Sequence, residues 1–129
     1  MISGNRLASC SNGLSEIRAK EGSYTYMRES ALSIIVPAYN EAEGIALVLD
    51  QIQQAMGKSG LQYEILVVDD GSADGTADLA EQAGFRVLRH AENRGYGAAL
   101  KTGVRRATYD LVAITDADGT YPNERIPEL

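Results

Sequence analysis

The chain has 129 residues and a mass of 13.9 kDa, which fits one domain whose hydrophobic core needs neither disulfides nor structural metals. Eighteen acidic residues against twelve basic ones give a formal net charge of -6, which argues against nucleic-acid binding. A single cysteine, Cys10, and a single histidine, His90, exclude an internal disulfide and a Cys/His zinc cluster, and they indicate a reducing, cytoplasmic environment.

Residues 1–31 are rich in Ser, Gly, Glu and Arg and lack the long apolar block of a secretory signal. The only local pattern in them predicts a short helix around residues 14–20. No run in the chain approaches the roughly 18 apolar residues of a membrane-spanning helix. We therefore expect a flexible leader over residues 1–31, followed by a domain that begins at residue 32.

From residue 32 onward one unit repeats: a short β-branched run, a turn rich in Gly and Asp, and a helical pattern. This alternation predicts an α/β fold, with a mostly parallel sheet and flanking helices. Pro37 is expected to mark the end of the first strand. The strands are predicted at residues 33–36, 63–68, 85–88 and 111–115.

Three helices are predicted between these strands. The first begins at a capping box of Asn40 and Glu43 and runs to about Met56, with Ile45, Val48, Leu49, Ile52 and Met56 as its buried stripe. The second is capped by Ser72 or Asp74 and ends at Gly84, and the third runs to about Ala107 with Leu100, Val104 and Ala107 at helical spacing.

After Asp118 the chain contains Pro122 and Pro127 and ends at Leu129, where another helix would be starting. Four parallel strands with three helices leave an outer strand uncovered. The sequence therefore leads us to expect the front part of a longer protein.

Acidic residues follow three of the predicted strands, at the sheet edge where α/β proteins bind ligands: Glu41, Asp69, Asp70, Asp116 and Asp118. Asp116 and Asp118 stand two apart in an extended segment, so both can hold one Mg²⁺ or Mn²⁺ together with water and a diphosphate. A plain turn at Asp118 is the alternative for this pair. Asp69 and Asp70 either cap a helix or accept hydrogen bonds from a nucleoside.

The remaining polar candidates have simpler interpretations. His90 is interpreted as an ordinary loop residue, and Tyr96 as a packing residue. Gly95 and Gly97 lack the third glycine of the dinucleotide-binding fingerprint and follow the third strand instead of the first, so we interpret them as turn and packing residues.

Four motifs in order resemble the family 2 inverting glycosyltransferases, close to the dolichyl- or polyprenyl-phosphate sugar synthases. They are Ile34–Glu41, Val67–Thr76, Asn93–Ala99 and Asp116–Asp118. The resemblance covers the chain from residue 32 onward and implies an A-type glycosyltransferase fold, similar to the Rossmann fold, whose front part binds a GDP- or UDP-linked sugar. Thr120 departs from the pattern, because many dolichyl-phosphate mannose synthases have a glutamine there.

The resemblance also implies residue roles. Asp116 and Asp118 would hold Mg²⁺ or Mn²⁺ on the diphosphate. The nucleotide-binding residues would be Pro37, Ala38, Tyr39, Glu41, Val68, Asp69, Asp70, Asp116 and Ala117. The acceptor would be a polyprenyl phosphate at a membrane surface, and the catalytic residue would lie beyond Leu129, so this chain is expected to bind the donor better than it turns it over.

Two other functions are compatible with the motifs. The run Ile65–Asp70 also resembles the acidic pair of a response-regulator receiver domain, in which Asp116 would be the phospho-acceptor. The second alternative is an inactive donor-binding fragment.

Overall fold

The computed structural model describes residues 14–18, 24–28, 31–119 and 122–128, and the chain divides into two compact units, residues 1–31 and 32–129. In the first unit, β1 (Leu14–Arg18) and β2 (Tyr24–Arg28) pair antiparallel. The short helix predicted around residues 14–20 is therefore wrong over residues 14–18, and residues 19–20 lie outside the described residues. So short a segment does not sustain a helix alone, whereas the Tyr and Thr residues of β2 favour strand pairing.

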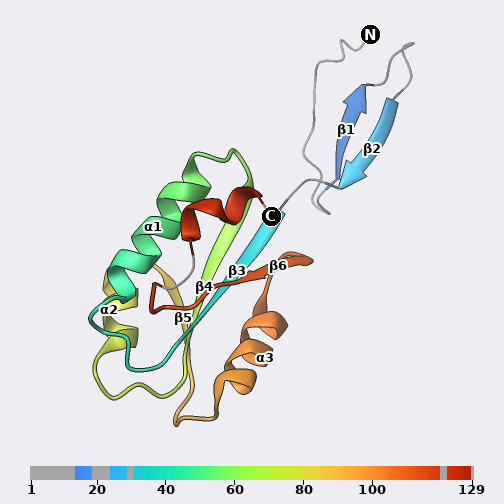
Figure 1. Ribbon diagram of the computed structural model, residues 1–129. Coiled ribbons are helices and arrows are strands. Elements are labelled where there is room, and N and C mark those ends of the chain that lie inside the picture. Colours follow the sequence, from blue (N-terminus) through green and yellow to red (C-terminus); the bar gives the residue numbers. More distant parts are fainter. Residues whose placement is uncertain (1–13, 19–23, 29–30, 120–121, 129) are drawn as a thin grey trace. The chain divides into compact units, whose positions relative to one another are not determined.

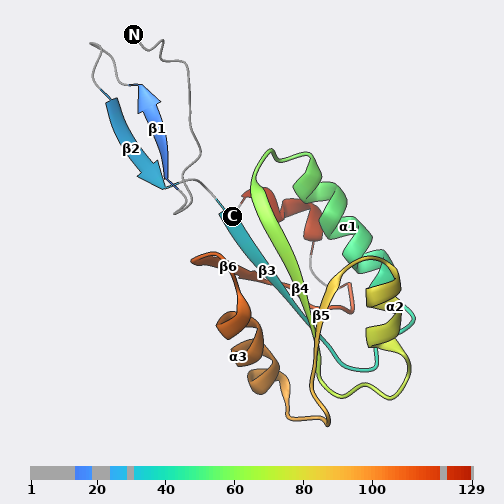
Figure 2. The same cartoon turned by 180° about the vertical axis from the view of Figure 1, so that it is seen from behind.

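The second unit is a four-stranded sheet in the order β5-β4-β3-β6, with α1 and α2 on one face and α3 on the other (Figures 1 and 2). The strands are β3 (Ala31–Ala38), β4 (Gln62–Asp69), β5 (Arg86–Arg89) and β6 (Leu111–Ile114). The helices are α1 (Ile45–Gly57), α2 (Thr76–Gln82), α3 (Tyr96–Arg106) and the 3-10 helix η2 (Asn123–Glu128).

Parallel pairing confirms the predicted fold class. Strand β3 pairs parallel with β6, where Leu32 lies opposite Leu111, and β4 pairs parallel with β5, where Leu66 lies opposite Arg86. None of the helices among the described residues reaches the length and apolarity that crossing a bilayer requires.

The two faces of the sheet divide the core between alternate residues of each strand. On β3, Ile34 and Val36 pack in the cluster that includes α1, whereas Ile35 packs with Ala99 of α3. The 3-10 helix η2 adds Ile126 to the α1 side, so both faces of the central strands are covered. Because both of its faces are covered, the sequence of β3 is an almost continuous run of apolar residues.

Strand β3 continues past Pro37 to Ala38, so the predicted strand end at Pro37 is wrong. Hydrogen bonds on the two sides of the strand explain why proline is tolerated. The Ile35 carbonyl accepts the N–H of Thr115 on the β6 side, and the Ala38 carbonyl accepts the N–H of Asp70 on the β4 side. Because successive residues alternate sides, the Pro37 nitrogen faces the β6 side, where pairing with β6 has ended.

The buried stripe predicted for the first helix is confirmed in α1, but the predicted start is wrong. The helix begins at Ile45 with Gly44 as its N-cap residue, and no side chain caps it. Instead, the Glu41 carbonyl accepts the N–H groups of Gly44 and Ile45. Asn40 has a positive φ of 53° and lies outside the helix, so Asn40 and Glu43 do not form a capping box.

In α3 the fully buried positions are Ala99 and Gly103, whereas Val104, predicted at a core-facing position, is 51% exposed. A Cβ atom added at Gly103 would come closer to the Ile35 side chain than real Cβ atoms come. Small residues thus let α3 lie directly on β3. Of the predicted apolar positions, Ala107 does pack against this side of the core, whereas Val104 is exposed.

Candidate functional site

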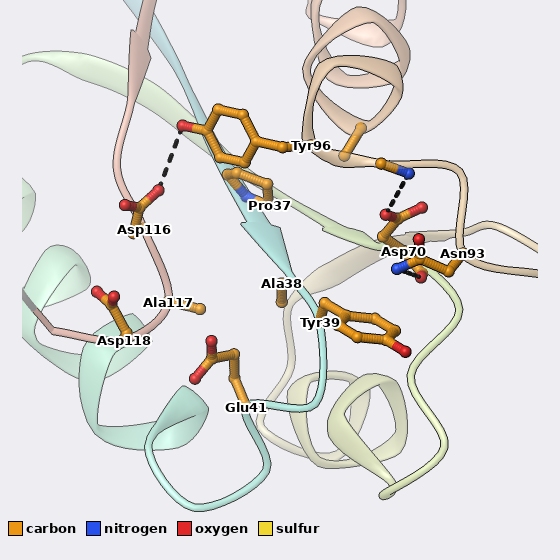
Figure 3. Close-up of a pocket in the computed structure, with 12 residues that line it drawn as sticks. Pro37, Ala38, Tyr39, Glu41, Asp70, Asn93, Tyr96, Asp116, Ala117 and Asp118 are labelled. Atoms are coloured by element: carbon orange, nitrogen blue, oxygen red, sulfur yellow. Dashed lines mark hydrogen bonds between the residues drawn. The ribbon is translucent and has the colours of Figure 1, made fainter.

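A pocket of about 420 Å³ opens at the carboxyl ends of β3, β4 and β6 (Figure 3). Because β3 lies between β4 and β6 in the sheet, the segments that follow these three strands meet at one edge. Gly95 and the first turns of α3 line a further side of the pocket. The lining residues are Pro37, Ala38, Tyr39, Glu41, Asp70, Asn93, Gly95, Tyr96, Ala99, Asp116, Ala117 and Asp118.

Two residues from the expected nucleotide-binding set are not among this pocket's lining residues, although both are described. Val68 is fully buried in the core with Ile35 and Leu66. Asp69 is 4% exposed, and its Oδ2 accepts the Ser72 N–H at 3.1 Å. The other oxygen of Asp69, Oδ1, is buried and has no hydrogen-bond partner, a state that costs free energy unless a ligand or water supplies a donor.

One end of the pocket is acidic, because the carboxylates of Glu41, Asp116 and Asp118 lie there (Figure 3). Burial, and then the negative charges of Asp118, Asp74 and Asp116, raise the pKa of Glu41. The Tyr96 hydroxyl donates to Asp116 Oδ1 at 3.3 Å. Negative charges that repel one another fit a site for a hard divalent cation, whose binding relieves the repulsion.

The described residues contain no group of three or more His, Cys, Asp or Glu side chains arranged to hold a metal ion. Asp116 and Asp118 therefore fit a cation only if other ligands complete its shell. Mg²⁺ and Mn²⁺ accept one or two carboxylates together with water and phosphate oxygens. The acidic end thus fits a cation that arrives with a phosphate-bearing ligand.

At the other end of the pocket, Asp70 anchors the loop before α3. Its Oδ1 accepts the Arg94 N–H at 2.8 Å, and its Oδ2 accepts the Gly95 N–H at 2.9 Å. Asn93 adds a side-chain hydrogen bond to the Asp70 carbonyl at 3.4 Å (Figure 3). Burial by itself would raise the pKa of Asp70, but hydrogen bonds from His90 and from these two N–H groups outweigh burial and hold the pKa below its usual value.

His90 is not the ordinary loop residue that the sequence indicated. Its side chain is 6% exposed; Nδ1 lies 2.8 Å from Asp70 Oδ1, and Nε2 lies 2.8 Å from the Thr102 hydroxyl. The sequence pattern offered one weak signal, since this histidine directly follows β5 and stands at the same sheet edge as Asp70.

Two loops at the pocket, residues 39–42 and 71–76, are joined by reciprocal hydrogen bonds. The Asn40 N–H donates to the Ser72 hydroxyl at 2.8 Å, and Asn40 Oδ1 accepts the Ala73 N–H at 2.9 Å. These contacts occupy the side chain that was predicted to cap α1. Asn40 therefore positions the loop that carries Tyr39 and Glu41.

The same two loops are joined through Thr76 and Asp74. The Thr76 hydroxyl accepts the Glu41 N–H at 2.9 Å and donates to Asp74, whose Oδ2 accepts the Ala42 N–H at 3.1 Å. The residue at the N-cap position of α2 is Gly75, so the predicted caps Ser72 and Asp74 are wrong for that position. Asp74 Oδ1 does accept the Thr76 N–H, at 3.1 Å, so it still supports the helix start.

Replacing Thr76 with valine is expected to destabilise the chain by about 1–2 kcal/mol. Valine has nearly the same shape but leaves the part-buried Glu41 N–H without an acceptor. Thr76→Ser keeps the hydroxyl and is the matched control. Urea unfolding of both variants measures the difference, and equal stability losses would show that these hydrogen bonds contribute little.

The pocket combines two chemical features that suit a phosphorylated ligand. Its acidic end can hold a divalent cation, and the N-terminal turn of α3, with Gly95 and Tyr96, contributes to its lining. Helix N-termini favour anions because their first N–H groups are unpaired and the helix dipole is positive there. The exposed ring of Tyr39 adds an aromatic surface, which suits a nucleobase.

The sheet order does not fit a receiver domain. In that fold, the strand before the acidic pair lies next to the strand that carries the phospho-acceptor. Here β3 separates β4, which precedes Asp70, from β6, which precedes Asp116.

Residues 33–129 match the model of the family "Glycosyl transferase family 2". An undecaprenyl-phosphate 4-deoxy-4-formamido-L-arabinose transferase from Klebsiella pneumoniae is 38% identical over 111 residues, covering 81% of this chain and 34% of that protein. The chain thus spans about a third of the length of such relatives.

Solved structures give a consistent result. A mannosyltransferase from Pyrobaculum calidifontis in complex with GDP-Man and Mn²⁺ superposes with a TM-score of 0.64 and 32% identity, over 75% of this chain and 30% of that one. A glucosyl-3-phosphoglycerate synthase from Mycobacterium tuberculosis in complex with Mn²⁺, UDP and glucosyl-3-phosphoglycerate has a TM-score of 0.60 and 30% identity, over 68% of this chain and 33% of that one.

Proposed function

This chain belongs to glycosyl transferase family 2, and on that premise we propose that residues 32–129 bind the donor in a metal-dependent, inverting sugar transfer from a nucleotide-diphosphate sugar. One observation carries the proposal: acidic residues that follow separate strands, Asp70 after β4 and Asp116 and Asp118 after β6, line a single pocket with Glu41. Such a pocket suits this donor, because the cation at the acidic end can bind the diphosphate while the rest of the pocket holds the nucleoside.

We assign the cation to Asp116 and Asp118, and the nucleoside to the remaining lining residues beside Asp70 and Tyr39. The Asp70 carboxylate already accepts three protein donors, two on Oδ1 and one on Oδ2, so one acceptor position of Oδ2 remains for a ligand. We also assign Asp69 to nucleotide binding, because its buried Oδ1 lacks a hydrogen-bond donor from the protein. Val68 supports the site only by packing beneath it.

The residues suit departure of a nucleoside diphosphate. A bound Mg²⁺ or Mn²⁺ supplies positive charge that stabilises the leaving diphosphate. Asp116 and Asp118 would hold the cation at the acidic end of the pocket, and the Tyr96 hydroxyl orients Asp116 by a hydrogen bond to Oδ1. An acceptor oxygen would bond to the anomeric carbon from the face opposite the diphosphate while the bond from this carbon to the diphosphate oxygen breaks, which inverts the configuration; the nucleoside diphosphate leaves with the bonding electron pair.

For the acceptor we propose a polyprenyl phosphate, an assignment supported by relatives whose name specifies undecaprenyl phosphate. A phosphate monoester is already ionised near pH 7, so it attacks without a strong base. Such an acceptor places the whole enzyme at a membrane surface, and the single cysteine supports the cytoplasmic side. We assign no catalytic base within this chain and expect it to bind the donor rather than turn it over.

Calorimetric titration with GDP and UDP tests the proposal. We expect at least one of them to bind with Mn²⁺ and to bind about tenfold or more weakly without it. Asp118→Ala should abolish the effect of the metal, whereas Asp50→Ala, at an exposed position on α1, should preserve it. Equal affinity with and without Mn²⁺ would contradict the cation site.

A further inference from the structure

The buried His90 imidazole links three elements that meet beneath the pocket. Its backbone N–H donates to the Asp69 carbonyl at 2.8 Å, which extends the ladder between β4 and β5. Its ring contacts the Asp70 carboxylate through Nδ1 and the Thr102 hydroxyl of α3 through Nε2, both at 2.8 Å. Because a carboxylate only accepts hydrogen bonds, Nδ1 carries the proton toward Asp70.

The contact with Asp70 fixes more than one side chain. Asp70 uses the oxygen that faces His90 to accept the Arg94 N–H as well, and its second oxygen accepts the Gly95 N–H. These N–H groups belong to the segment that leads from β5 into α3, and Asn93, Gly95 and Tyr96 of this segment line the pocket. The orientation of the Asp70 carboxylate therefore decides where this wall of the pocket lies.

We propose that His90 is a positioning residue for the donor pocket: held by Thr102, its imidazole orients Asp70, and Asp70 in turn holds the backbone of residues 93–95 as the pocket wall. This inference rests on the proposed function for the identity of the ligand. The wall itself is a feature of the chain without ligand. Its influence extends to the acidic end, since Tyr96 follows Gly95 and donates to Asp116.

Burial distinguishes this contact from a surface ion pair. Both side chains are 6% exposed, so the imidazole and carboxylate have little access to water as an alternative partner. The wall, residues 93–95, also packs closely against the loop after β4. The backbone of Asn93 lies so near Gly71 that a Cβ atom added there would be 2.5 Å from the Asn93 nitrogen. If the hydrogen bond from His90 is lost, we therefore expect the Asp70 carboxylate to rotate and to release the N–H groups of Arg94 and Gly95.

Two substitutions separate the two ring contacts. The amide nitrogen of His90→Asn can occupy the Nδ1 position and keep the donor to Asp70, while the contact with Thr102 is lost. His90→Gln reaches the Nε2 position and keeps Thr102, while the donor to Asp70 is lost. Both replace a buried ring by a smaller amide, so a purely structural role predicts similar behaviour for the two variants.

The first measurement is amide hydrogen exchange of Arg94 and Gly95 by NMR in the 129-residue chain without ligand. We expect protection in His90→Asn to stay within about threefold of the native chain, and in His90→Gln to fall about tenfold or more. Thermal midpoints of both variants serve as the control for overall stability. Equal protection in the two variants would overturn the proposal. If His90→Gln does not fold, the same exchange is measured in Thr102→Val and Thr102→Ser, since the native ring, unlike the shorter asparagine, needs the Thr102 hydroxyl to keep Nδ1 turned toward Asp70. Protection of Arg94 and Gly95 should then be lower in Thr102→Val than in Thr102→Ser, and equal protection in these two would overturn the proposal.

The second measurement is the Kd for GDP and UDP with Mn²⁺. For the nucleotide that the native chain binds, we expect the Kd to rise about tenfold in His90→Gln and less than about threefold in His90→Asn. A native chain that binds neither nucleotide would overturn the proposed function. Loss of amide protection in His90→Gln would in that case still establish His90 as the residue that positions Asp70 and residues 93–95.

Discussion

Alanine at position 71 is expected to destabilise the second unit by about 3 kcal/mol or more. Gly71 has a φ of +79°, a left-handed conformation that costs a residue with a Cβ roughly 1–2 kcal/mol. The added Cβ would also lie 2.5 Å from the Asn93 nitrogen and 2.5 Å from the Glu92 carbonyl carbon. Both atoms belong to the backbone, so relief requires the loop to move, and overpacking of this kind costs about 1–3 kcal/mol more.

Gly75→Ala is the matched control for this prediction. Gly75 has a φ of +85°, but nothing lies within 4 Å of a Cβ added there, so only the cost of the left-handed conformation, about 1–2 kcal/mol, is expected. Urea unfolding of both variants measures the difference between them. Equal losses would show that the loop at residues 92–93 accommodates a methyl group freely.

Gly71→Ala is also expected to disturb the pocket, not only the stability of the unit. A methyl group at residue 71 pushes on the segment whose Arg94 and Gly95 N–H groups bind Asp70. Gly71→Ala should therefore also reduce amide protection of Gly95, whereas Gly75→Ala should not.

The apolar pattern alone predicted the parts of the fold that depend on periodicity. The stripe of α1, from Ile45 to Met56, is buried as expected, because a helix on one face of a sheet needs such a stripe. The strands also lie within one or two residues of their predictions, as β4 (Gln62–Asp69) shows. Together with the rule that ligands bind at carboxyl strand ends, these elements were enough to place Asp70 and Asp116 at one edge.

Features that depend on tertiary contacts were not predictable in the same way. Asn40 and Glu43 have the spacing of a capping box, yet Asn40 binds the loop at residues 72–73, which lies far from it in sequence. The burial of Gly103 depends on its distance from Ile35, which no periodicity encodes. Likewise, the role of His90 arises only when the ends of β4 and β5 lie side by side.

Asp70→Asn is expected to destabilise the chain by about 3 kcal/mol at pH 7. The carboxylate accepts hydrogen bonds from His90, Arg94 and Gly95, and it is buried. An amide offers one oxygen and one NH₂ group, so at least one of these donors faces another donor, and a buried group without its partner costs several kcal/mol. Asp50→Asn, at an exposed position, should change the stability by less than about 0.5 kcal/mol.

The pH dependence of this difference identifies the carboxylate as its source. Because the pKa of Asp70 is lowered in the folded chain, its contribution to stability is fully present above the unfolded pKa of about 4 and is lost as the pH falls through the folded pKa. Urea unfolding at pH 7, 5 and 3 should therefore show that the stability advantage of the native chain over Asp70→Asn is smaller at pH 3 than at pH 5. A difference that stays constant over this range would mean that the neutral side chain already makes these contacts, and that charge on Asp70 does not hold the pocket wall in place.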